Sequence, residues 1–241
     1  MYLSLVIPVY NESKIIVSAI EKVLMYFFKK GYFFEIIVVD DGSVDNTREL
    51  VRDFAKSRPN VILVSNGCNK GKGFSVKNGV LVSKGDYVLF SDADLSTPIA
   101  ELDKLMFYFA QGYDVVIGSR ALKGSDIILK QPWIRQNMGK VFNLLVRGLR
   151  LADVRDTQCG FKCFSRVAAE KIFKLQRFDR FCFDVEILYI AKRLGFKIKD
   201  VPVAWVNRID SRVAIFKDSV KMFIDLFKIR INAFRGLYNA A

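Results

Sequence analysis

The feature that most constrains the fold is an alternation of short apolar runs with helical stripes in the first half of the chain. Five runs are continuous enough in apolar residues to be strands buried on both faces: 2–8, 35–40, 61–65, 87–91 and 115–118. Between the first two runs, apolar residues recur at three- and four-residue steps from Ile15 to Phe27 and end at Gly31, as in an amphipathic helix. This rhythm predicts an α/β fold with a mostly parallel sheet flanked by helices.

The second half is less regular. Helices are expected over 132–151, 165–175, 184–194 and 215–235, with a strand over 198–206. The chain shows neither an internal repeat nor a flexible linker, so we expect one domain over residues 1–212, with halves 1–118 and 119–212. An amphipathic C-terminal helix over 213–241 completes the prediction.

Charge and residue usage narrow the chemistry. The 241 residues hold 38 Lys and Arg against 25 Asp and Glu, a net charge of +13, which implies an acidic partner: a phosphate-bearing substrate, an anionic membrane or a nucleic acid. The absence of His excludes His-liganded zinc and His-dependent triads, so carboxylates must supply acid–base or metal chemistry. Four cysteines are too few for a disulfide scaffold and are expected to be free thiols in a cytoplasmic protein. No apolar run approaches the length of a bilayer span, and we expect no cleavable signal, because Met1 leads directly into the first predicted strand.

Acidic residues follow three of the predicted strands. Glu12 comes after the first strand, Asp40 and Asp41 end the second, and Asp92 and Asp94 follow the fourth. Because ligands gather at the carboxyl ends of parallel strands, these carboxylates are expected to form one electronegative cleft. The alternative for the segment 40–43 is a turn with a helix cap.

Asp92 and Asp94 carry the most chemistry in that set. Two carboxylates separated by one small residue, Ala93, suit a hard divalent cation. Diphosphate oxygens and waters would complete the octahedral coordination of that cation. The sequence therefore predicts a site for Mg²⁺ or Mn²⁺ together with a nucleotide.

A glycine-rich loop over 69–73, Asn-Lys-Gly-Lys-Gly, precedes another helix. Its backbone N–H groups and Lys72 are expected to hold an anion, although a loop cap explains the pattern equally well. The spacing is not that of a Walker loop.

Taken together, these motifs resemble the inverting family 2 glycosyltransferases of the GT-A fold. The motifs at 8–12, 40–43, 69–73, 92–94 and 118–120 follow that family's order. Two later segments, 155–162 and 183–191, look in particular like the dolichyl-phosphate β-glucosyltransferases. The resemblance covers nearly the whole chain and implies transfer of glucose from UDP-glucose to a dolichyl or polyprenyl phosphate, for glycan assembly.

The resemblance also assigns roles by position. Residues 1–118 would be the nucleotide-sugar half and 119–212 the acceptor half. The nucleoside would be held by Pro8, Tyr10, Glu12, Val38 and Asp40. Asp92, Ala93 and Asp94 would handle the ribose, the diphosphate and the metal, and Arg120, Arg208 and Arg212 would meet phosphate groups.

The chemistry of such an acceptor suits a chain without His. A lipid phosphate has a second pKa near 6 and is already mostly an anionic nucleophile at pH 7, so positioning and charge stabilisation are the main tasks. Inversion of an α-linked donor would give a β-linked lipid-phosphate sugar. Asp94, Asp156 and Asp184 are the catalytic candidates, and Asp156 and Asp184 are expected to contact sugar hydroxyls or to act as an orienting base. The alternatives are an Asp156 paired with Arg155 and an Asp184 that caps a helix.

Other functions stay open at this point. The loop 205–212 lacks the Glu and Gly common in the eukaryotic glucosyl enzymes, and its Asn-Arg…Ser-Arg pattern resembles the mannosyl-phosphate synthases, so GDP-mannose is an alternative donor. A nucleic-acid-binding protein would need a basic stripe with stacking aromatics, whereas here the strand ends are acidic. A nucleotidyltransferase would place a glycine-rich loop at the first strand, which this chain lacks.

The C-terminal segment mixes apolar and basic residues at helical spacing. Between 213 and 238, Phe223, Phe227 and Phe234 alternate with Lys221, Lys228 and other basic residues, as in a helix that lies in a membrane interface. The stretch 141–151, with Arg147 and Arg150, offers a second such surface. We expect peripheral binding to the cytosolic face of an anionic membrane; the alternative is a helix that packs on the domain with a solvated basic face.

Overall fold

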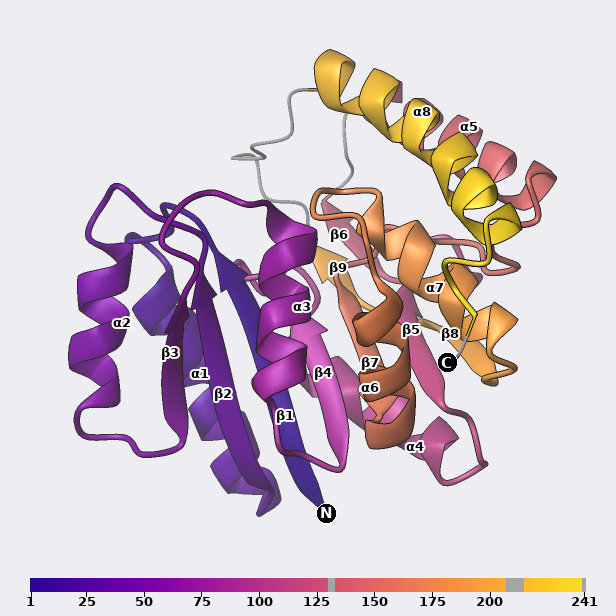
Figure 1. Cartoon of the computed structure of the whole chain (residues 1–241). Helices are drawn as coiled ribbons and strands as arrows, with labels where there is room; N and C mark the ends of the chain where they lie inside the picture. The colour runs from indigo at the N-terminus through magenta and orange to yellow at the C-terminus, as the bar shows by residue number, and fades with distance from the viewer. Residues whose placement is uncertain (130–132, 207–214, 240–241) are drawn as a thin grey trace.

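The chain builds a seven-stranded sheet in the order β3-β2-β1-β4-β7-β5-β8 (Figure 1). This computed structural model describes residues 1–129, 133–206 and 215–239. The strands are β1 (Tyr2–Val9), β2 (Phe33–Asp40), β3 (Val61–Ser65), β4 (Tyr87–Ser91), β5 (Val115–Ser119), β7 (Phe161–Ser165) and β8 (Ile198–Pro202). A second sheet pairs β6 (Ile127–Leu129) with β9 (Trp205–Val206). The predicted α/β fold is confirmed.

Helices cover both faces of the large sheet. On one face lie α3 (Lys72–Val82), α6 (Arg166–Leu175) and α7 (Phe183–Arg193), and on the other lie α1 (Ile16–Lys30) and α4 (Leu102–Phe109), the latter preceded by the 3-10 turn η1 (Ile99–Glu101) (Figure 1). Helix α2 (Thr47–Ala55) packs beside β3. The remaining helices, α5 (Trp133–Gly148) and α8 (Ile215–Phe234), lie side by side above the carboxyl ends of the strands in Figure 1.

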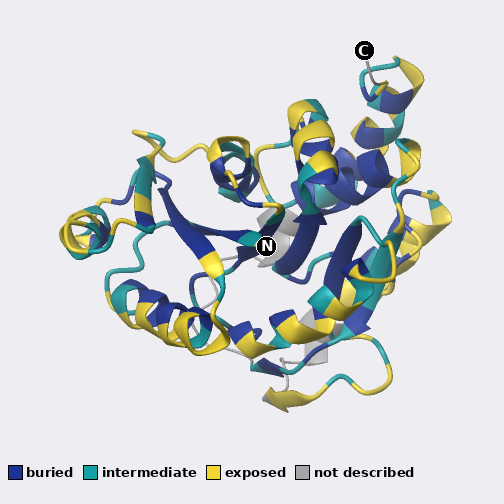
Figure 2. Ribbon diagram, turned by 90° about the horizontal axis from the view of Figure 1, so that it is seen from below, coloured by how far each residue is buried: buried dark blue, intermediate teal, exposed yellow. Residues whose placement is uncertain are grey.

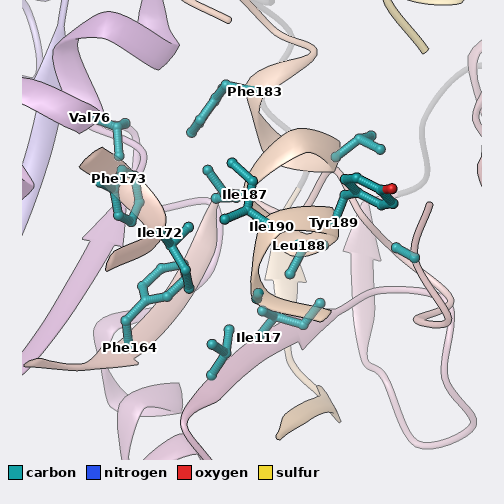
Figure 3. Packing of buried hydrophobic residues seen from close by; sticks show 14 of the residues in the cluster. Val76, Ile117, Phe164, Ile172, Phe173, Phe183, Ile187, Leu188, Tyr189 and Ile190 are labelled. Atoms are coloured by element: carbon teal, nitrogen blue, oxygen red, sulfur yellow. The ribbon is translucent and has the colours of Figure 1, made fainter. Parts of the chain in front are cut away.

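Two hydrophobic cores result from the period of two along each strand. Val6 and Val39 face α3 and α7, whereas their neighbours Ile7 and Val38 face α1. Figure 3 shows the first core, where Phe164, Phe173 and Phe183 pack with the apolar face of α7. Figure 2 shows the central strands of the large sheet mostly dark and the outer surfaces of the helices light, so these strands are buried on both faces, as their continuous apolar runs predict.

Local signals explain several helix ends. Gly31 adopts φ 65° and its N–H binds the carbonyls of Phe27 and Phe28, which ends α1 as expected. Before α2, the Asp45 carboxylate accepts bonds from the N–H and the hydroxyl of Thr47, so Asp45 caps the helix although Asn46 holds the cap position.

The prediction fails at β7, which it left out. This strand runs antiparallel between β4 and β5, so the sheet is mixed rather than wholly parallel in its second half. The expected single strand over 198–206 is also wrong, because it divides into β8 and β9 of different sheets. All four cysteines are free, as expected.

Helix α8 has two sides. Leu226, Ile229 and Ala233 are buried in the first core, and Phe223 stacks edge-to-face on Phe142 of α5. On its other side Phe227 and Phe234 are exposed, as are Ile224 and Ile231. Within the described residues, no helix combines the length and the apolarity that a bilayer span requires.

Candidate active site

The segment after β1 turns sharply and is fastened to the segment after β2. Asn11 adopts φ 54°, its N–H donates to the Ser43 hydroxyl over 2.9 Å, and its side-chain oxygen accepts from the N–H of Val44 over 2.8 Å. The N–H of Glu12 donates to the Thr47 hydroxyl at 2.7 Å. Pro8 is paired with Val39 inside the sheet, and Tyr10 and Glu12 follow beyond the carboxyl end of β1.

Asp40 and Asp41 bind the protein itself. The buried Asp40 carboxylate receives Arg48 at 3.0 Å and the N–H of Ser43 at 3.1 Å. The buried Asp41 carboxylate accepts from the Asn66 side chain and from the N–H groups of Lys70 and Gly71, at 2.8 to 3.0 Å. The turn alternative therefore describes this segment better than an open acidic cleft does.

Asp92 meets a cation at the end of β4. The ammonium group of Lys72, the first residue of α3, lies 2.6 Å from Asp92 Oδ1. Burial alone would lower the pKa of Lys72, but the charges of Asp92, Asp184 and Asp94 outweigh it and raise the pKa to about 12. Lys72 is thus firmly charged and belongs to the same group of residues as the three carboxylates.

Gly160 makes room for Asp92. A Cβ at position 160 would lie 2.1 Å from Asp92 Oδ2, and the carbonyl of Gly160 accepts from the N–H of Asp92 at 3.2 Å. Two residues on, the Asp94 carboxylate accepts from the N–H and the hydroxyl of Ser96, each at 2.8 Å, which fixes its orientation. Both carboxylates are half-buried, so each keeps some exposed surface.

These donors fit a hard divalent cation that brings further ligands of its own. Asp92 and Asp94 supply oxygens, which Mg²⁺ and Mn²⁺ prefer, and Asp92 already attracts one cation in Lys72. Among residues 1–129, 133–206 and 215–239, no three Asp, Glu or Cys side chains gather into a fuller cage. The expected electronegative cleft is partly neutralised, because Arg48 pairs with Asp40 and Lys72 pairs with Asp92.

Arg120 and Asp156 form a two-point ion pair. Arg120 Nε lies 2.7 Å from Asp156 Oδ2 and Nη2 lies 2.9 Å from Oδ1, while the N–H of Arg120 also donates to the carboxylate. Although burial acts to raise it, the Arg120 charge holds the pKa of Asp156 below its ordinary value. The pair uses two of five guanidinium N–H groups and leaves three for an anion. Asp156 therefore pairs with Arg120 rather than with Arg155, and as a base it is weak.

Lys162 and Asp184 form a second, deeper pair. The ammonium group of Lys162 contacts the Asp184 carboxylate and donates to the carbonyl of Cys159 at 2.6 Å, with the Phe90 ring beside it. Burial raises the pKa of Asp184 against the opposing charges of Lys162 and Lys72. The cap position of α7 is Cys182, so Asp184 lies in the first helical turn and the alternative of a helix cap is wrong.

A small cavity of about 80 Å³ lies between α1 and the Asp94 turn. Ser18, Lys14 and Lys22 line it on one side, and Ala93, Asp94 and Leu95 line it on the other. It is far smaller than the several hundred Å³ that ligand pockets usually occupy, so it is not by itself a nucleotide site.

The other predicted residues are placed unevenly. Ala93 lies between the two carboxylates, as expected, but the side chain of Val38 is fully buried in the second core and has no surface for a ligand. Arg208 and Arg212 lie outside the described residues. Lys162 was not among the site residues predicted from the sequence. A lysine between apolar residues, two places after Gly160, was the signal that could have indicated it.

Residues 4–173 match the profile of Glycosyl transferase family 2. The chain belongs to this family. The glycosyltransferase is 34% identical over 99% of its length to a dolichyl-phosphate beta-glucosyltransferase of Dictyostelium discoideum, covering 76% of it. It is 39% identical to one from Trichomonas vaginalis over 96% of this chain and 73% of the relative, and 32% identical to the human one over 98% and 77%.

Solved structures support the fold. Glucosyl-3-phosphoglycerate synthase from Mycobacterium tuberculosis, in complex with Mn²⁺, UDP and phosphoglyceric acid, superposes with a TM-score of 0.70 at 22% identity, over 94% of this chain and 78% of that one. Mannosyl-3-phosphoglycerate synthase from Rubrobacter xylanophilus gives a TM-score of 0.69 at 18% identity, over 98% and 74%. The glycosyltransferase therefore has the GT-A arrangement that the family resemblance implied.

Proposed function

We propose that this glycosyltransferase transfers glucose from UDP-glucose to the phosphate of dolichyl or polyprenyl phosphate, with inversion, giving a β-linked lipid-phosphate sugar. The observation that carries this proposal is the identity of 32–39% with dolichyl-phosphate beta-glucosyltransferases over 96% or more of the chain. Identity that extends through 119–206 also covers the half proposed to bind the acceptor.

The donor occupies the carboxyl ends of β1, β2 and β4 in this proposal, within the half 1–118. Pro8, Tyr10 and Glu12 line the part of the site that binds the nucleoside. Asp40, paired with Arg48, stabilises the chain beside that part of the site. The ammonium group of Lys72 lies where a diphosphate would meet it, at the start of α3 and 2.6 Å from Asp92. A diphosphate competes with Asp92 for Lys72, so donor binding loosens that pair.

A divalent cation, Mg²⁺ or Mn²⁺, is held by Asp92 and Asp94 in the proposed complex. The cation stabilises negative charge on the leaving diphosphate. Ala93 keeps the space between the two carboxylates small, and Ser96 keeps the Asp94 carboxylate oriented by two hydrogen bonds.

The acceptor phosphate binds to Arg120 in the half 119–212. Asp156 grips Arg120 at two points and thereby aims the unused N–H groups, so Asp156 is a positioning residue rather than a base. The phosphate is an anion at pH 7 and attacks without a strong general base. Asp184, which is paired with Lys162, acts on Lys72 through its charge, which helps to raise the pKa of Lys72.

Arg208 and Arg212, outside the described residues, are proposed as further phosphate contacts because the resemblance assigns them that role. Their loop pattern is also the reason to keep GDP-mannose as the second candidate donor. The whole chain's identity with glucosyl enzymes favours UDP-glucose.

The test is a direct assay of the purified protein. Labelled UDP-glucose and GDP-mannose are each incubated with dolichyl phosphate and Mn²⁺, and lipid-extractable label is counted. Transfer from UDP-glucose alone supports the proposal; transfer from GDP-mannose alone assigns the second candidate; label in neither lipid product contradicts both. The anomeric configuration of the product, read by NMR, tests inversion.

We also propose that the apolar face shared by α5 and α8 lies on the cytosolic surface of an anionic membrane, where the lipid acceptor resides. Leu144 of α5 and Ile224, Phe227 and Phe234 of α8 are exposed, and Lys140, Arg147, Lys221, Lys228 and Arg235 stand among them. Apolar area together with basic groups is the composition of an interfacial helix. Each basic residue near such a surface contributes about 1 kcal/mol.

A further inference from the structure

The chain after α8 returns to the protein core through Tyr238. This side chain is fully buried, and its ring packs edge-to-face on Tyr189 of α7 with a centroid distance of 5.9 Å. Its hydroxyl donates to Glu186 Oε1 over 2.7 Å and accepts from Asn232 at 3.2 Å. A residue near the end of the chain is thus fixed to the first turn of α7.

Glu186 also binds the loop 176–182. It is fully buried, and its carboxylate accepts from the N–H groups of Arg177 and Phe178 at 2.8 to 3.1 Å. Among the described residues, Glu186 accepts hydrogen bonds from these two N–H groups and from the Tyr238 hydroxyl. Burial raises the pKa of Glu186, which shows that its charge is costly in this place and depends on these donors.

The loop 176–182 in turn touches the start of α3. Gln176 donates to the carbonyl of Gly73 at 2.9 Å, and the carbonyl of Asp179 accepts from the N–H of Phe74 at 3.0 Å. The backbones are so close that a Cβ on Gly71 would lie 2.4 Å from the Asp179 oxygen, and one on Gly73 would lie 2.6 Å from the Phe178 oxygen. Movement of the loop therefore moves the residues on either side of Lys72.

We propose that Glu186 and Tyr238 are positioning residues that tie the seating of α8 to the placement of Lys72 against Asp92. Each link is a contact described above: Tyr238 to Glu186, Glu186 to the loop 176–182, the loop to Gly71, Gly73 and Phe74, and Lys72 to Asp92. The effect on catalysis rests on the proposed role of Lys72 in donor binding. The link itself does not.

Tyr238→Phe removes one hydroxyl and keeps the ring, and Tyr26→Phe is the matched control. Tyr26 also donates to a carboxylate, Asp103, at 2.6 Å, but it lies on α1 at the opposite face of the sheet. Glu186→Gln is the second variant, since it keeps the shape and loses the charge.

The first measurement is amide hydrogen exchange of the full chain without substrate. Tyr238→Phe is expected to speed exchange at Arg177, Phe178 and Phe74 roughly fivefold to tenfold, the loss of one buried hydrogen bond, and Tyr26→Phe to leave them unchanged. Unchanged exchange at Phe74 in both Tyr238→Phe and Glu186→Gln would overturn the proposed link.

The second measurement is steady-state kinetics with UDP-glucose and dolichyl phosphate. Tyr238→Phe is expected to raise the KM for UDP-glucose roughly fivefold while the KM for the lipid and kcat stay near wild type. A lower melting temperature with an unaltered KM for UDP-glucose would make the contact merely structural and overturn the proposal. If the wild-type protein does not use UDP-glucose, the proposed function fails while the exchange result still judges the link.

Discussion

Lys162 and Asp184 face each other with side-chain exposures of 0% and 3%, so a full ion pair is enclosed between β7 and α7 beside the candidate active site. Removing one partner of such a pair leaves the other without compensation in a medium of low polarity, whereas removing both can be nearly neutral.

Lys162→Met is therefore expected to lower the free energy of unfolding by about 3 kcal/mol near pH 8, and Lys162→Met with Asp184→Leu to recover most of that loss. The pKa of Asp184 is already raised by burial and rises further without Lys162. When a group has a raised pKa in the folded state, the free energy of unfolding of the protein falls as the pH rises through that pKa. The loss of stability in the single variant is therefore expected to be smaller in acid than near pH 8. Urea denaturation at several pH values measures this. Equal losses in the single and double variants would contradict it.

Asp156 is expected to give the opposite pH dependence. Its pKa is lowered in the folded protein. The ionised Asp156 therefore contributes to the free energy of unfolding above the ordinary pKa of 3.8, and this contribution is lost as the pH falls through the lower pKa of the folded state. Asp156→Asn should be less stable than wild type at pH 7, with a difference that narrows below about pH 4. Asp200→Asn, which removes a carboxylate that accepts from the N–H of Arg155, is the control. A difference that persists unchanged to pH 2 would argue against the Arg120 pairing as its source.

Asp92→Asn and Asp94→Asn are expected to reduce glucosyl transfer by at least roughly 100-fold and to raise the Mn²⁺ concentration needed for half-maximal activity. Asp53→Asn removes a carboxylate of α2 from its exposed pair with Lys56 and should leave both values unchanged. Metal titrations of the three variants, with circular dichroism to verify folding, provide the measurement. Wild-type metal dependence in Asp94→Asn would remove it as a ligand.

Phe234→Asp is expected to weaken binding to vesicles that contain phosphatidylserine, because it puts a charge on the exposed face of α8. Phe33→Asp is a matched control: Phe33 is 78% exposed and Phe234 is 83% exposed, but Phe33 lies at the start of β2, at the opposite end of the sheet. Cosedimentation at low and high salt separates the apolar contribution from the basic one. Equal binding by both variants would exclude α8 as the contact surface.

The sequence predicted the first half of the fold well because its signals are local. Continuous apolar runs, the stripe that ends at Gly31 and the acids after strands depend on neighbouring residues, and the structure bears them out. Strand β7 was missed because Lys162 interrupts its apolar pattern and Ser165 has the features of a helix cap. The ion pair with Asp184, 22 residues away, and the hydrogen bond to the carbonyl of Cys159 make a lysine acceptable there.

The candidate site was predicted as a set of residues but not as a set of partners. Asp156 was expected beside Arg155 and instead grips Arg120, 36 residues earlier. Asp40 and Asp41 were expected to line a cleft, yet they fasten the turns around it. Partners this far apart in sequence meet only through the order of strands in the sheet, which composition and periodicity leave undetermined.

The reversed direction of β7 has a consequence for how the two halves share work. Because β7 begins where its neighbours β4 and β5 end, the preceding segment 156–160 lies at the carboxyl ends of those strands, next to Asp92. Gly160 then touches Asp92 directly. In the proposed complex, the groups that meet the acceptor phosphate and those that hold the nucleotide sugar are therefore neighbours, because the chain that carries Asp156 contacts the turn that carries Asp92.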